Sequence, residues 1–329
     1  GPSIGWEQWP GLDAHEVRDR DYFFVASFVA WAFWAALGIA DLVRATALRL
    51  PVARRSMAVA VFGLALLPAV LNARMATRKQ TPEATLARDF AHALLQSVPP
   101  GGILFTWGDN DTFPLWYAQA VEGVRRDVTI VCLALAETEW YQRQLRNWKA
   151  GPLDRANLAA VWQSSPVPDL NGPIHTISDS AINAFSPFLV DKSQAIQLRN
   201  GLSVELTKGD AIYAKDMLLL QVLITNAGVR PIAWSVTTAN KLYGLGPQLV
   251  QQGLAIVMPT VPVTGAVGGD AVGPGKTPID LATTRRLINE TWKYGKLLDG
   301  GTDRLDANIR AMSGTWAIPF VQAAVASVM

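Results

Sequence analysis

The amino-acid sequence predicts an α/β fold: a mainly parallel, periplasmic α/β domain carried by a two-helix transmembrane anchor. Two long uncharged apolar segments, 22–40 and 56–73, predict the anchor. Between 103 and 135 the pattern is strand, acidic loop, helix and strand, the repeating unit of a parallel sheet whose two faces are covered by helices. We therefore divide the chain into an N-terminal segment 1–21, a helical hairpin 22–76 and a domain 77–329.

Composition excludes several classes of protein. The net charge of the 329 residues is only +2, and basic residues are not interleaved with aromatics, so we expect no nucleic-acid partner. The single cysteine, Cys132, rules out an intramolecular disulfide. The three histidines are far apart and lack metal-ligand spacing. The sequence therefore predicts no metal site and no cofactor.

The two apolar segments have nearly the length that a bilayer requires. Tyr22–Ala40 has nineteen residues and Ser56–Ala73 eighteen, against the roughly 20 needed to span the core as a helix. Pro68 lies near one end of the second segment, where a membrane helix tolerates it. The aromatic residues expected to face lipid or partner helices are Trp31, Phe33, Trp34 and Phe62.

Trp6 and Trp9 precede the first apolar segment. Tryptophan is enriched at headgroup depth, where one side of the ring is apolar and the other is wet, so these residues suit a membrane-interface contact. Ordinary packing in a loop is the alternative.

Arginines set the expected orientation. Four of them, Arg44, Arg49, Arg54 and Arg55, lie at or between the ends of the two segments. Short loops rich in Arg and Lys stay in the cytoplasm. The remaining chain would then lie on the other side of a bacterial inner membrane, in the periplasm.

The domain is expected to contain helices and strands in the following order. Helices are predicted at 81–98, 112–123, 137–148, 210–226, near 248, 281–294 and 303–327. Strands are predicted at 103–107, 128–135, 203–206, 232–236 and 254–258. Residues 153–209 form an irregular insertion, and the Gly- and Pro-rich stretch 260–278 forms a long loop or an arm that contacts a partner.

Acidic residues at the strand ends are the candidate site. Asp109, Asn110 and Asp111 follow the first strand, where open α/β sheets usually bind ligands, and their oxygens suit a hard cation or sugar hydroxyls. The structural alternative is that Asp111 caps a helix beginning near Thr112. Glu137 follows the second strand and is either part of an acidic pair or the solvated start of a helix.

The stretch Gly108–Tyr117 (GDNDTFPLWY) carries a family resemblance, which Arg18–Phe24, Met217–Trp234 and Leu242–Pro259 extend. The chain resembles bacterial multi-spanning membrane proteins related to protein O-mannosyltransferases, in which the last membrane helices precede a soluble domain. Family members that transfer sugars have a multi-helix membrane half with a catalytic acid. We find no counterpart of that half in this sequence.

The resemblance and the sparse polar groups together lead to three hypotheses. We expect a non-catalytic, membrane-anchored scaffold or assembly subunit of a larger complex, for example photosynthetic or respiratory, with other integral membrane subunits and lipid as partners. The first alternative is a glycosyltransferase-related protein that binds a glycan or a lipid-linked sugar. The second is a hydrolase of cell-envelope substrates that uses Asp109, Asp111 and Glu137.

Overall fold

The computed structural model describes residues 25–49, 54–76, 85–238, 242–260, 265–267, 277–294 and 307–328. Trp6, Trp9 and most of the Gly- and Pro-rich stretch 260–278 lie outside these residues. The chain divides into two compact units. The first comprises Gly1–Ala84 with Asp303–Arg310, and the second comprises Thr85–Thr302 with Ala311–Met329.

The first unit contains two long helices, α1 (Val25–Arg49) and α2 (Arg54–Ala76). Within the described residues, only α1 is long and apolar enough to cross a membrane, over Val25–Ala45. The apolar part of α2 is limited to Val59–Ala73. The expectation of two membrane spans is therefore corrected to one candidate, because the second apolar run is shorter than a bilayer core.

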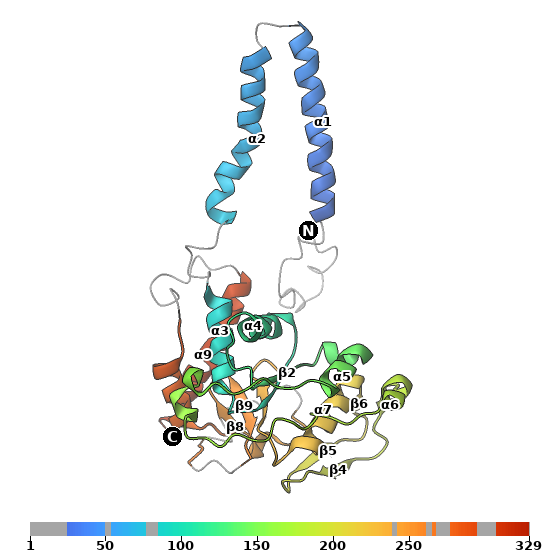
Figure 1. The fold of residues 1–329 in the computed structure, drawn as a ribbon, viewed down its shortest axis with the longest axis vertical. Helices are drawn as coiled ribbons and strands as arrows, with labels where there is room; N and C mark the ends of the chain where they lie inside the picture. The colour runs from blue at the N-terminus through green and yellow to red at the C-terminus, as the bar shows by residue number, and fades with distance from the viewer. Residues whose placement is uncertain are drawn as a thin grey trace. The chain divides into compact units, whose positions relative to one another are not determined.

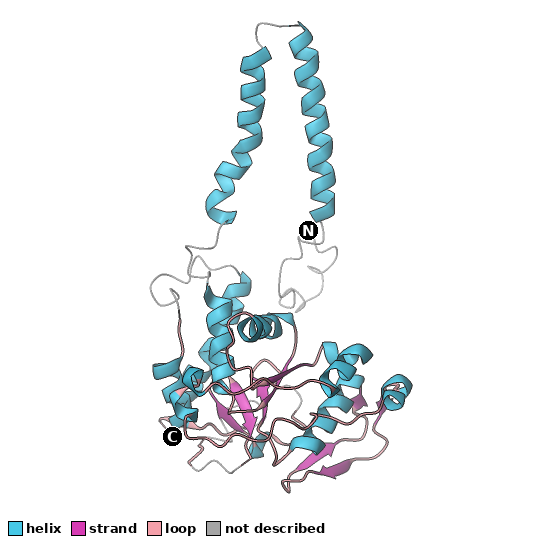
Figure 2. Cartoon of the chain, in the orientation of Figure 1, coloured by secondary structure: helices cyan, strands magenta, loops and turns pink. Residues whose placement is uncertain are grey.

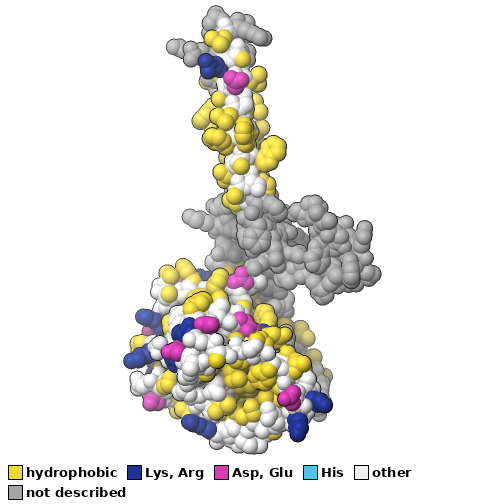
Figure 3. Space-filling model, turned by 90° about the vertical axis from the view of Figure 1, so that its right-hand side faces the viewer, with side chains coloured by type: hydrophobic (Ala, Val, Ile, Leu, Met, Phe, Trp, Pro, Cys, Tyr) yellow, Lys and Arg dark blue, Asp and Glu magenta, His cyan; other side chains and the backbone are white. Residues whose placement is uncertain are grey.

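The side chains of α1 have little contact with the rest of the described chain. Trp31 is 76% exposed and Trp34 72% exposed, and Phe33, on the same helix, and Phe62, on α2, are exposed as well. Figure 3 shows hydrophobic side chains (yellow) along the long helices of the first unit, with charged side chains only toward one end. Arg44 is exposed, whereas the side chains of Arg49, Arg54 and Arg55 are not among those described.

A five-stranded mixed sheet forms the centre of the second unit (Figures 1 and 2). Its order is β2-β1-β7-β9-β8, from β1 (Ile103–Thr106), β2 (Thr129–Cys132), β7 (Ile232–Ser235), β8 (Val250–Gln252) and β9 (Ala255–Met258). β1 pairs in parallel with β2 and β7, while β9 pairs antiparallel with β7 and β8. Every residue of the five strands is buried, as expected for a sheet covered on both faces.

The antiparallel half corrects the prediction of a mainly parallel sheet. The helix expected near Gln248 is a single 3₁₀ turn, Gly246–Gln248, and the residues after it form strand β8. Gly253 then reverses the chain with φ +59°. Glycine adopts this conformation without steric cost, so a tight hairpin stands where a crossover helix was expected.

Helices α4 (Asp109–Ala120) and α7 (Ala214–Asn226) cover opposite faces of the sheet. Successive strand residues point to opposite faces. The Thr106 hydroxyl lies 2.7 Å from that of Thr112 in α4. Phe105 points the other way and packs on Trp234, which shares a cavity with Leu219 of α7. The connection from β1 to β2 runs over one face of the sheet and the connection to β7 over the other. The direction in which the strand order advances therefore reverses between β1 and β7.

Most of the remaining elements follow the predicted order with shifted ends, but α6 (Asp179–Ala184) lies within the insertion, where no helix was predicted. Their bounds are α3 Leu86–Ser97, a 3₁₀ turn Leu135–Glu137, α5 Glu139–Arg146, α6 Asp179–Ala184, α8 Leu281–Arg286, a π-helical turn Leu287–Thr291 and α9 Ala307–Ala326. The insertion contributes three strands to two small antiparallel pairs: β4 (Gln194–Gln197) pairs with β5 (Ser203–Leu206), and β3 (Phe188–Leu189) pairs with β6 (Ala211–Ile212), which follows the insertion. The short strand expected at 203–206 is therefore confirmed.

A buried ion pair fixes the connections at the amino ends of the strands. Arg125 donates to both carboxylate oxygens of Asp127, at 2.9 and 3.0 Å, and also to the carbonyls of Leu95 and Val98 at the end of α3. Asp127 in turn accepts from the Gly101 N–H. Because both charges are buried and fully bonded, this edge of the sheet has a structural role.

Candidate functional site

The candidate site is a cavity of about 300 Å³ at the carboxyl ends of the parallel strands, which we call the strand-end cavity. Trp107 follows β1, Leu133 follows β2, and Thr238 follows β7. This is the edge where the strand order reverses, the usual place for ligands in open α/β sheets. The full lining is Trp107, Leu133, Tyr213, Lys215, Asp216, Leu219, Trp234, Thr238 and Tyr243.

Asp111, from the predicted acidic loop, is engaged in structure. Helix α4 begins at Asp109, so Asp111 lies in its first turn and not at the N-cap as predicted. Its carboxylate accepts hydrogen bonds from the Trp107 and Gly108 N–H groups at 3.2 and 3.1 Å, and from the Thr237 hydroxyl at 2.7 Å. Asp111 therefore joins the loop after β1 to the loop after β7.

Asp109 and Asn110 lie on the outer side of the same turn. Asp109 is half-buried and Asn110 is exposed. Neither contributes to the lining of the strand-end cavity. Within the described part of the chain, no three His, Cys, Asp or Glu side chains are grouped as metal ligands would be. The described residues therefore group no further acidic ligands around this loop that would hold a hard cation.

Glu137 reaches the cavity through Lys215. The two side chains form an ion pair of 2.5 Å. The Lys215 ammonium also lies over two aromatic rings, 5.7 Å from the centre of Trp107 and 4.7 Å from that of Tyr213. These distances are typical of cation–π contacts. Glu137 thus contacts the cavity lining through the Lys215 side chain, and Asp111 contacts it through the backbone N–H of Trp107.

Asp216 and Tyr243 form the polar wall of the cavity. Asp216 is buried and accepts from the Tyr213 N–H at 2.9 Å and from the Tyr243 hydroxyl at 2.6 Å. Burial, together with the bond to Asp216, raises the pKa of Tyr243, so this hydroxyl keeps its proton. Tyr243 has φ +48°, a conformation rare for residues other than glycine and one that often marks a binding site.

Trp234 contributes to the lining of the cavity. Its side chain is completely buried, and its indole Nε1 has no hydrogen-bond partner among the described residues. A buried N–H without a partner costs free energy, so each such group calls for an explanation. Trp234 lines the cavity, but its Nε1 exposes less than 1 Å² of surface and is therefore enclosed by the protein itself.

Most residues of the cavity lining carry no recognisable signal in the sequence. Trp234 appeared only as an apolar strand residue, and Tyr213, Lys215 and Asp216 lie in the predicted helix 210–226. The available signal was positional: Asp216 and Tyr213 flank the start of α7, whose amino end faces the strand ends. No motif in the sequence connects these residues with Trp107.

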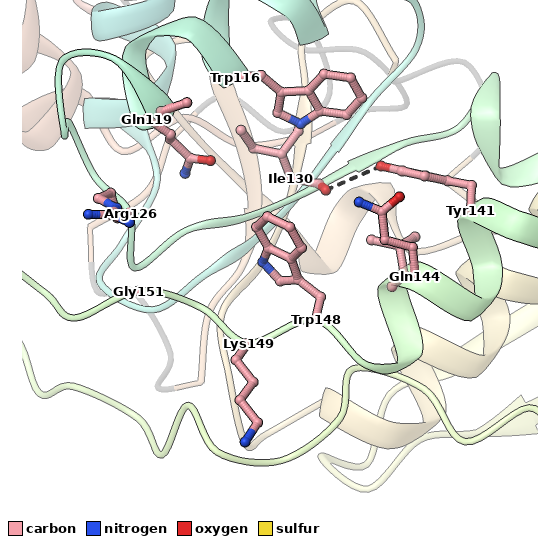
Figure 4. Close-up of a pocket in the computed structure, with 11 residues that line it drawn as sticks. Trp116, Gln119, Arg126, Ile130, Tyr141, Gln144, Trp148, Lys149 and Gly151 are labelled. Atoms are coloured by element: carbon pink, nitrogen blue, oxygen red, sulfur yellow. Dashed lines mark hydrogen bonds between the residues drawn. The ribbon is translucent and has the colours of Figure 1, made fainter.

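A second cavity, of about 370 Å³, lies beside the edge strand β2, and we call it the lateral cavity (Figure 4). Trp116, Tyr141 and Trp148 contribute aromatic walls, with Arg126 and Lys149 near its margin. The Tyr141 hydroxyl accepts from the Cys132 N–H at 3.0 Å and donates to the Ile130 carbonyl at 3.5 Å. Tyr141 therefore occupies backbone groups that an edge strand would otherwise expose.

Comparison with known proteins gives one family match. A family model described as TMEM260-associated domain 2 matches residues 87–156, from α3 to the residues after α5. The chain is therefore similar, over these residues, to a family tied to a protein related to protein O-mannosyltransferases. No curated protein and no solved structure gives a significant match. The matched part includes the acidic loop, Glu137 and Trp107, but not Asp216, Trp234 or Tyr243.

Proposed function

We propose that the chain is a membrane-anchored, non-catalytic scaffold subunit of a larger membrane complex. The observation that carries this proposal is the exposed apolar surface of α1, where Trp31 and Trp34 are among the most exposed side chains. An apolar surface of this extent must be covered by lipid or by other helices. Large aromatic side chains on a membrane helix offer both kinds of contact.

The positions of the acidic residues support a role without catalysis. Asp111 holds two loops together, and Glu137 is paired with Lys215. A general base needs a free carboxylate within hydrogen-bond reach of its substrate. The geometry therefore favours the scaffold over a hydrolase that uses Asp109, Asp111 and Glu137.

The proposal places the domain on the periplasmic side of a bacterial inner membrane. This requires the chain to cross a second time at α2. Its 23 residues amount to about 34 Å of helix, enough for a hydrocarbon core of roughly 30 Å, although its apolar run is shorter. Arginines at the helix ends can extend to the headgroups and compensate for a short apolar run.

Purification from native membranes tests the scaffold proposal. We expect the chain, extracted in mild detergent, to migrate as a stoichiometric complex with other membrane proteins. The double change Trp31→Leu and Trp34→Leu keeps α1 apolar but removes its aromatic surface, and we expect it to weaken the complex. The matched control is Val29→Leu on the same helix. Migration of the native chain as a free monomer, or sugar transfer by the purified chain, would overturn the proposal.

A further inference from the structure

The lateral cavity has the size and the walls of a small-molecule site. Ile130, Tyr141 and Leu145 are buried and contribute apolar surface to it. Trp148 also lines it and is 45% exposed, so the cavity is open to solvent on that side. Figure 4 shows the indoles of Trp116 and Trp148 on opposite sides of Ile130. The volume of about 370 Å³ is within the range for small ligands and suits one flat ring system.

Two positive side chains belong to this lining. Among the described residues, neither Arg126 nor Lys149 pairs with a carboxylate, and no Asp or Glu lines the cavity. The Gly151 N–H donates to the Arg126 carbonyl at 2.8 Å and so holds the segment after α5 beside Arg126. In Figure 4 Lys149 points away from the indoles, so we assign the contact with a ligand to Arg126. The unpaired positive charge favours an anionic ligand.

Trp116 adds a neutral donor to the same cavity. Its Nε1 has no hydrogen-bond partner among the described residues and, unlike Trp234 Nε1, it is not enclosed by the protein. Figure 4 shows this nitrogen on the side of the ring that faces Ile130. An indole N–H only donates, and so does a guanidinium. The ligand therefore has to supply acceptor oxygens together with an apolar face.

The free edge of β2 is closed to an extended peptide. The Tyr141 hydroxyl bonds both the Cys132 N–H and the Ile130 carbonyl. The Gln119 amide donates to the Val128 carbonyl, just before the strand, at 2.8 Å. A partner chain that added a strand here would need these backbone groups. The observations therefore favour a small molecule over a segment of another protein.

We propose that the lateral cavity binds a small aromatic carboxylate. The flat ring packs against the indoles of Trp116 and Trp148, and the carboxylate accepts hydrogen bonds from the guanidinium of Arg126. The two oxygens of a carboxylate match the fork of a guanidinium, and aromatic rings pack favourably on one another. This binding is independent of the scaffold role, because it uses only the second unit of the chain.

Binding can be measured by calorimetry and saturation-transfer NMR on the full chain in phosphatidylcholine nanodiscs. Empty nanodiscs give the background, because the ligands also enter lipid. The probe is naphthoate, and naphthamide is the matched ligand with the same ring and no charge. We expect naphthoate to bind and naphthamide to bind roughly tenfold more weakly, the effect of one charge-assisted hydrogen bond.

Four variants make the test specific. Arg126→Gln should weaken naphthoate binding roughly five- to tenfold and leave naphthamide binding unchanged, because it removes only the charge. Trp148→Ala should weaken the binding of both ligands roughly tenfold, because it removes a wall that the ring contacts. Arg199→Gln and Phe188→Ala, exposed positions outside the cavity, are the matched controls and should have no effect.

Four results would overturn the inference. They are no binding of naphthoate, naphthamide binding as tightly as naphthoate, and naphthoate binding that neither cavity variant affects. The fourth is tighter binding of a short peptide that ends in a phenylalanine carboxylate, which would identify the end of a partner protein as the occupant.

Discussion

Asp111 and His175 are buried polar side chains whose hydrogen-bonding groups find partners inside the chain. Asp111 accepts three hydrogen bonds. His175 accepts at Nδ1 from the Ile177 N–H, so its Nε2 carries the proton that it donates to the Gln142 carbonyl. Trp234 differs from both, because its Nε1 is buried without a partner among the described residues. Hydrogen-bond accounting at single residues thus separates polar groups that stabilise the fold from a buried donor that is left unsatisfied.

Replacing Asp111 should destabilise the domain. Asp111→Ala removes the acceptor of three donors, and we expect the free energy of unfolding to fall by about 2 to 3 kcal/mol. Asp111→Ser should also be destabilising, because its shorter side chain cannot serve all three donors. Glu139→Ala, an exposed acid in the first turn of α5, is the control and should change stability by less than about 0.5 kcal/mol. Chemical denaturation followed by circular dichroism measures both; equal stability of the Ala variant and the native chain would refute this role.

His175 should make stability depend on pH. Burial lowers its pKa in the folded chain below the ordinary 6.5. As pH falls below about 6.5, His175 binds a proton in the unfolded chain but not yet in the folded chain. The contribution of His175 to stability is therefore fully present above that pH and is lost as pH falls toward the folded pKa. We expect the unfolding free energy to drop between pH 7.5 and 5.5, and His175→Gln to flatten this slope. An unchanged slope in the variant would contradict the assignment.

At the scale of elements, the β8–β9 hairpin decides the character of the sheet. Its turn packs tightly against neighbouring elements, since the Gly253 N–H donates to Thr284 at 3.1 Å and the Leu254 N–H donates to the hydroxyl of Ser97 at the end of α3. A Cβ at position 253 would lie 2.6 Å from Ser97 Oγ and 2.8 Å from Trp292. The hairpin is therefore fixed by helices that are distant from it in the sequence.

Gly253→Ala should weaken the fold for two reasons. Its φ of +59° strains any residue with a Cβ, and the added carbon has no room. We expect a loss of about 1 to 3 kcal/mol in unfolding free energy. The matched control is Gly172→Ala, where a Cβ meets nothing within 4 Å. Thermal unfolding of the two variants gives the comparison, and equal midpoints would show that the turn tolerates a side chain.

At the scale of the whole molecule, the number of membrane crossings determines on which side the domain lies. If α1 alone crosses, the domain shares a compartment with the residues after Arg49; if α2 also crosses, the two are separated. Composition and length identify α1 as a candidate span and leave α2 short of the usual apolar length. The periplasmic placement is therefore testable by chemical access.

We expect labelling to separate the two sides. A cysteine at Val52 should resist an impermeant thiol reagent in intact cells, whereas one at the exposed Ser164 should react. The native Cys132 is buried and should not react with the thiol reagent. Equal protection of both cysteines, with labelling only after lysis, would mean that the chain crosses once and that the domain is cytoplasmic.

The sequence by itself determined the α/β class, the apolar helix α1 and the order of strand, acidic loop, helix and strand between Ile103 and Cys132. These features follow from local periodicity and from runs of apolar residues, which act over a few turns of chain. The tertiary structure decided the rest. Whether β9 pairs parallel or antiparallel depends on a turn that packs on α3, and the cavity joins Trp107 to Tyr213 and Trp234. Contacts between residues more than a hundred positions apart leave no periodic trace, so only the folded chain shows that these side chains form one site.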